Sequence, residues 1–98
     1  MDLQACTEAI RAKLGEDSSL NSTLKFDCGD NGIVHVDAIA KPHRVSNENL
    51  DAICIVALEL ADLSAMLSGE LNAVSGFMAG KLKVSGDMSV AMRLQNVV

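Results

Sequence analysis

The sequence is short of aromatic residues, of basic residues and of long apolar runs. Of its 98 residues only Phe26 and Phe77 are aromatic, so its core must be built from Leu, Val, Ile, Ala and Met. Such a core is pliable, because Met in particular adapts its shape. The longest uncharged apolar run, residues 52–58, is far shorter than the ~20 residues that a membrane-spanning helix needs. The sequence therefore predicts a soluble protein without a membrane span.

The shortage of basic residues argues against nucleic acid as a partner. Eight Lys and Arg face thirteen Asp and Glu, a formal charge of -5, whereas nucleic-acid binding depends on positive charge. Residues 1–68 hold five basic and eleven acidic residues, so their net charge is -6. Residues 69–98 hold three basic and two acidic residues, so their net charge is +1. An anionic group is therefore better tolerated near the C-terminal third.

Three cysteines, Cys6, Cys28 and Cys54, are spaced too widely for a disulfide framework or a zinc site. We expect free thiols, a cytoplasmic location, and neither a metal nor a cofactor. Cys28 and His35 face each other across a predicted hairpin and form the one candidate catalytic pair. Cys28 belongs to the apolar alternation and His35 to the opposite one, which argues against an enzyme.

Hydrophobic periodicity divides the chain, a single domain over residues 1–98, into helices and strands of two different periods. We predict three helices, at residues 2–14, from residue 60 to a stop at Gly69, and at residues 88–95. We predict four strands, at residues 24–28, 33–38, 52–58 and 81–85. Residues 39–50 contain the only proline and read as a loop or an irregular edge. Both faces of the strand at 52–58 are apolar, which predicts cover on both sides. Without a regular βα repeat, the fold class is α+β.

The last predicted helix has more apolar surface than one buried face can use. Ser89, Arg93 and Asn96 fall in one narrow polar arc, and apolar residues occupy most of the remainder. A surface helix needs an apolar stripe of little more than ~100°, and this helix offers about twice that. One part can lie on the sheet, and the other must face a partner protein, a membrane or a bound apolar molecule.

The C-terminal stretch "GFMAGKLKVSGDMSVAMRLQNVV", residues 76–98, closely resembles the end of the sterol carrier protein type 2 domain, the non-specific lipid-transfer family. Members typically carry F-x-x-G-K-L-K-[IV]-x-G-[ND]-x-x-x-A-x-[KR]-L, which runs here from Phe77. The upstream "DLSAMLSGELN", residues 62–72, is similar to the preceding helix of that family. The strong similarity covers residues 51–96, and the N-terminal half agrees in its pattern of elements.

The resemblance implies a five-stranded, largely antiparallel sheet with helices packed on one side, enclosing an apolar lipid tunnel that the C-terminal helix lines. It also implies binding of fatty acids, fatty acyl-CoA, phospholipids or sterols without chemical change. Matching positions, and helical phase for the first two, place these residues nearest the ligand: Leu63, Leu67, Phe77, Met78, Leu82, Met88, Met92 and Gln95. Two positions depart from the family pattern, with Leu60 where a carboxylate is common and Glu70 where a Lys is usual.

We therefore predict an intracellular lipid-binding or lipid-transfer protein that reversibly buries an apolar ligand, with no catalytic residues. A transient contact with a membrane and the oligomeric state stay open. The alternative is an accessory or interaction subunit, which uses the apolar C-terminal helix to dock a partner chain or to deliver lipid to an enzyme. A second alternative is an enzyme that uses Cys28 and His35.

Overall fold

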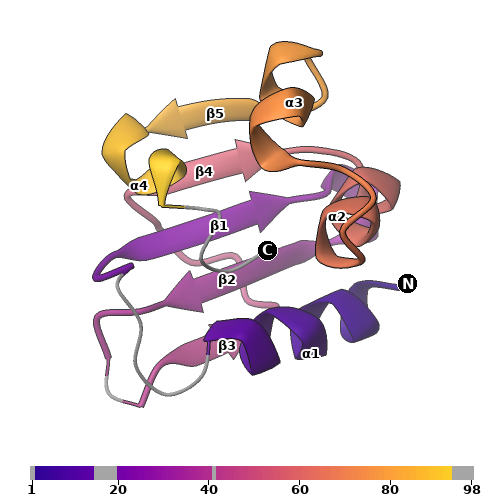
Figure 1. Ribbon diagram of the computed structural model, residues 1–98. Helices are drawn as coiled ribbons and strands as arrows, with labels where there is room; N and C mark the ends of the chain where they lie inside the picture. Colours follow the sequence, from indigo (N-terminus) through magenta and orange to yellow (C-terminus); the bar gives the residue numbers. More distant parts are fainter. Residues whose placement is uncertain (1, 15–19, 41, 94–98) are drawn as a thin grey trace.

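A computed structural model describes residues 2–14, 20–40 and 42–93 of the chain. Within these residues, four helices and five strands follow one another in an α+β order (Figure 1). Their bounds are α1 Leu3–Leu14, β1 Thr23–Asp27, β2 Ile33–Asp37, β3 Arg44–Ser46, β4 Cys54–Ala57, α2 Leu60–Leu67, α3 Ala73–Met78, β5 Lys83–Gly86 and α4 Met88–Met92. No helix in this part of the chain is both long and apolar enough to cross a bilayer.

The five strands form one sheet in the order β3-β2-β1-β4-β5. β1 and β2 form the predicted hairpin, in which Phe26 lies opposite Val34, around a 3-10 turn at Gly29–Asn31. β1 and β4 are parallel, and the other neighbouring pairs are antiparallel. The predicted α+β class and the largely antiparallel sheet are thus confirmed. β3 is an edge strand within residues 39–50, where the sequence predicted a loop or an irregular edge.

The core lies between one face of the sheet and the helices. Strand alternation sends every second side chain of β1, β2 and β4 toward that face, where they are buried: Leu24, Phe26, Val34, Val36, Cys54 and Val56. α1 packs against α2, β2 and β3, and α4 packs against β4 and β5. Figure 1 shows these helices on the same side of the sheet.

The opposite face of the sheet carries no helix among the described residues. His35 is buried there, with its Nε2 2.9 Å from the carbonyl oxygen of Asp51. Ile53 is exposed, and Ile55 and Ala57 are only partly buried. The prediction that both faces of this strand are covered is therefore wrong, because the helices of the described residues lie on one face and leave Ile53 exposed on the other (Figure 1).

Local capping explains where the first two helices begin and end. The backbone N–H of Ala5 donates to Asp2 Oδ1 at 2.8 Å, and this bond caps α1. α2 ends just before Gly69, whose φ of +84° suits a residue without a side chain. At the start of α2, Glu59 makes no side-chain capping bond, and the helix is held by the burial of its apolar side.

Candidate functional site

The turn between β5 and α4 folds the C-terminal helix back over the sheet. Gly86 has a φ of +92°, and a Cβ at this position would lie 2.1 Å from the carbonyl oxygen of Ile53. The next backbone N–H, that of Asp87, donates to the same oxygen at 3.0 Å. Only glycine allows this close approach, so the direction of α4 depends on it.

Both ends of α4 are fixed by hydrogen bonds. Asp87 Oδ1 accepts from the backbone N–H of Ser89 at 2.9 Å and from its hydroxyl at 2.7 Å, and these bonds hold the pKa of Asp87 below its ordinary value. At the other end, Arg93 Nη1 donates to the carbonyl oxygen of Leu20 at 2.6 Å. Val90 is buried against the core between these anchors. The remaining apolar side of α4 faces away from the core.

α3 is a short helix that lies close to the start of β5. Its N-terminus is capped by Asn72, whose side-chain oxygen accepts from Val74 N at 2.9 Å and Ser75 N at 3.3 Å. Gly76 is buried, and a Cβ there would meet Leu82 at 3.5 Å. This is an ordinary contact distance, so α3 packs closely on Leu82 at this point.

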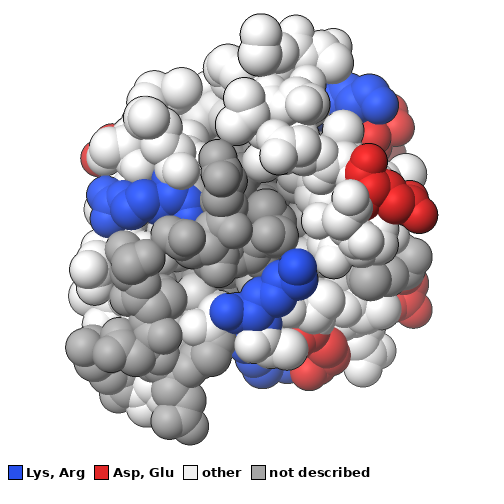
Figure 2. All heavy atoms as spheres, viewed as in Figure 1, with Lys and Arg blue, Asp and Glu red and all other residues white. Residues whose placement is uncertain are grey.

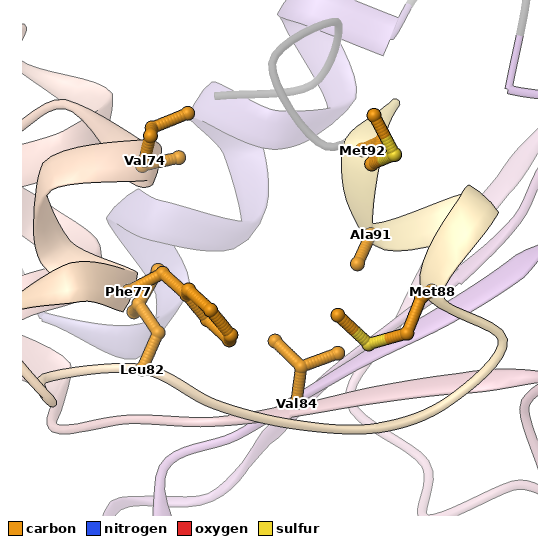
Figure 3. Close-up of a pocket in the computed structure, with 8 residues that line it drawn as sticks. Val74, Phe77, Leu82, Val84, Met88, Ala91 and Met92 are labelled. Atoms are coloured by element: carbon orange, nitrogen blue, oxygen red, sulfur yellow. The ribbon is translucent and has the colours of Figure 1, made fainter.

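An apolar pocket of about 220 Å³ lies between α3, β5 and α4. Figure 3 shows side chains from the three elements converging on this space. The lining residues are Ala73, Val74, Phe77, Leu82, Val84, Met88, Ala91 and Met92. None of them is charged or polar, and the pocket is open to solvent on one side, where Phe77, Met88 and Met92 are exposed. The pocket can therefore hold an apolar group by burial alone.

Four of the eight residues that the sequence places near a ligand line this pocket: Phe77, Leu82, Met88 and Met92. Leu63 and Leu67 are instead buried in the main core, 0% and 6% exposed. Met78 is 82% exposed and is not part of the lining. Gln95 lies outside the described residues. Within the described ranges the apolar space is an open pocket, and a closed tunnel is not seen there.

Four lining residues were missed by the sequence analysis: Ala73, Val74, Val84 and Ala91. Val84 alternates with Leu82, and Ala91 lies on the apolar arc of the last helix, so both signals were present. Ala73 and Val74 belong to α3, a helix that the sequence analysis did not predict. Asn72 before a run of small and apolar residues is the N-cap signal that would have found this helix.

The structure does not bring Cys28 and His35, the candidate catalytic pair, together. Burial raises the pKa of the Cys28 thiol to about 11, and it also raises those of Cys6 and Cys54. Raised values keep the thiols neutral and weakly nucleophilic at neutral pH. Cys28 lies on the core face of the sheet and His35 on the other. No cluster of residues suited to a metal ion occurs in the described ranges.

Comparisons with known proteins place the chain among its relatives. A family model described as the SCP-2 sterol transfer family matches residues 4–98. Stomatin-like protein 1 of Mus musculus is 35% identical over 94 residues, which are 94% of this chain and 23% of that protein. Sterol carrier protein 2 of Oryctolagus cuniculus is 41% identical over 51 residues, 52% of this chain and 9% of that protein. The chain thus spans less than a quarter of these curated relatives.

The fold also matches solved structures. The solution NMR structure of palmitated SCP2L2 from Aedes aegypti superimposes with a TM-score of 0.76 at 19% identity, over 99% of this chain and 94% of that one. At this level of identity the likeness concerns the fold alone.

Proposed function

The chain belongs to the SCP-2 sterol transfer family, and from this membership we propose that it binds a lipid reversibly in the pocket between α3, β5 and α4. The ligand is a fatty acid, a fatty acyl-CoA, a sterol or a similar molecule, and it leaves without chemical change. In this proposal the protein carries its ligand or hands it on, and it is not an enzyme.

The all-apolar lining of the pocket carries this proposal. Side chains such as Val84, Met88 and Ala91 offer no hydrogen bond and no charge to a ligand, so the free energy of binding must come from removing apolar surface from water. The second apolar side of α4, which the core does not use, forms part of this lining. A palmitated relative of the same fold supports an acyl chain as one class of ligand.

The volume of the pocket sets the scale of the interaction. A methylene group occupies about as much space as a water molecule, roughly 30 Å³, so 220 Å³ holds about seven methylenes. At ~0.8 kcal/mol each, their burial contributes at most about 6 kcal/mol. This is at the low end of the ~4 to 15 kcal/mol cost of association. We therefore expect weak binding with little selectivity for the head of the ligand.

Mass spectrometry of the organic extract of the purified protein tests the proposal. The expected result is a lipid with a long acyl chain or another apolar body, and uptake of a fluorescent fatty acid after the lipid is removed. A protein that contains no lipid, takes up no fatty acid and gains mass with concentration would favour the interaction subunit instead. In that case Met88 and Met92 would be covered by another chain.

A further inference from the structure

The mouth of the pocket is surrounded by exposed apolar side chains. Eight large hydrophobic side chains are strongly exposed in the described part of the chain, and five of them lie on α3 and α4. We call these five the apolar rim: Val74, Phe77, Met78, Met88 and Met92. Four of them line the pocket, and Met78 directly follows Phe77 on α3. Single exposed apolar side chains are ordinary, but a group gathered on two helices beside a pocket marks an interaction surface.

Met78 needs a separate explanation. It is the most exposed of the large hydrophobic side chains described, 82% accessible, and it is not part of the pocket lining. Neither core packing nor contact with a ligand in the pocket accounts for an apolar side chain at this place on α3. Cover by a surface outside the described residues would account for it.

The charge around α3 differs from that of the rest of the protein. Residues 71–86 contain no Asp or Glu and hold Lys81 and Lys83, although the whole chain carries -5. Figure 2 shows an uncharged surface at the top of the view, where Figure 1 places α3, with a Lys or Arg at its margin. Lys81 follows α3 closely, since its backbone N–H donates to the carbonyl oxygen of Gly76 at 2.9 Å.

Lys81 and Lys83 lie at the border between this uncharged surface and an acidic one. Both also line a neighbouring broad cleft, together with Asp27, Glu59 and Asp62. Among the described residues, neither lysine makes an ion pair. Their ammonium groups therefore remain available to an anion that approaches from the side of α3.

We propose that the apolar rim docks on the surface of a phospholipid bilayer. A bilayer with anionic lipids supplies both things that this surface matches: an apolar phase for Met78 and its neighbours, and a negatively charged surface for Lys81 and Lys83. Methionine side chains suit such an irregular contact because they are flexible. The mouth of the pocket then faces the acyl chains, so a lipid moves between bilayer and pocket without crossing water. This inference rests on the proposed function in one respect only, that the pocket holds lipid.

Co-sedimentation with vesicles of phosphatidylcholine and phosphatidylserine tests the docking. Met78→Glu places a charge in the rim, and we expect it to lower vesicle binding by about tenfold or more. Lys81→Gln should lower it by about fivefold, since each basic residue near an anionic surface contributes on that scale, and only when phosphatidylserine is present. Ile39→Glu is the matched control: it is also an exposed apolar residue, 60% accessible, but it follows β2, at the end of the molecule away from α3 (Figure 1).

Uptake of a fluorescent fatty acid without vesicles separates this inference from the proposed function. Met78→Glu should take up the probe as the unmodified protein does, because Met78 does not line the pocket. Vesicle binding that Met78→Glu leaves unchanged, or that Ile39→Glu lowers equally, overturns the docking surface. The docking surface is also overturned if the unmodified protein does not bind vesicles but forms a dimer that Met78→Glu dissociates. Failure of the unmodified protein to take up the probe counts instead against the proposed function.

Discussion

Filling the pocket from within should abolish ligand uptake while the fold survives. Ala91 lies on α4 with its methyl group directed into the pocket, between Val84 and Met92 (Figure 3). Ala91→Trp places an indole ring in that space. A densely packed core would resist such a change at a cost of ~1 to 3 kcal/mol, but an open pocket can absorb the added volume.

The size of the effect follows from the volume of the pocket. About seven methylenes fit in 220 Å³, and each one displaced costs about 0.8 kcal/mol. Losing only two of them costs roughly 1.6 kcal/mol, which exceeds the 1.4 kcal/mol of a tenfold change in affinity. We therefore expect Ala91→Trp to weaken uptake of a fluorescent fatty acid by at least about tenfold.

Ser89→Trp is the matched control on the same helix. Ser89 is exposed and does not line the pocket, and its backbone N–H, which Asp87 caps, is kept. This variant should take up the fatty acid normally. Denaturant melts of both variants measure folding alongside the binding titration. Full uptake by a folded Ala91→Trp protein would refute the placement of the ligand in this pocket.

Three further changes test the turn before α4, the cap of α3 and the effect of burial on the Cys28 thiol. Gly86→Ala should lower the free energy of unfolding by at least ~1 kcal/mol in a urea melt, because the new Cβ meets the carbonyl oxygen of Ile53 and the backbone φ is positive. Asn72→Ala removes the cap of α3 and should cost about 1 kcal/mol, whereas Asn72→Asp should keep most of it. Because burial raises the pKa of Cys28 from 9.0 to about 11, the folded state favours the neutral thiol. The contribution of this thiol to the free energy of unfolding is then fully present below pH 9 and is lost between pH 9 and 11. In urea melts the free energy of unfolding of Cys28→Ala should therefore fall less steeply over that range than that of the unmodified protein. Equal slopes would contradict the assignment.

The sequence predicted the parts of the fold in which local pattern and tertiary structure agree. Asp2 opens the first predicted helix and Asp87 directly precedes the last, and both accept the backbone hydrogen bonds of a helix cap. The hairpin around Gly29–Asn31 was readable because turn residues separate two alternating segments. The excess apolar surface of the last helix pointed to a partner outside the core, and its side chains line the pocket.

The positions of Leu63 and Leu67 could not be decided from helical phase. Both lie on the apolar side of α2, and periodicity gives the same signal for a side chain that packs in the core and for one that lines a pocket. The structure buries this side of α2 in the core, since α1 packs against it. Which apolar residues surround the pocket depends on α3, a six-residue helix too short to show periodicity.

The central claim is that an apolar ligand lies between α3, β5 and α4, and NMR contacts between protein and ligand test it most directly. A fatty acid bound to the isotope-labelled protein should show nuclear Overhauser effects from its methylenes to the methyl groups of Val84, Met88 and Ala91. The methyl groups of Leu63 and Leu67, buried in the main core, should show none. Contacts to Leu63 and Leu67 without contacts to Val84 and Ala91 would contradict the claim.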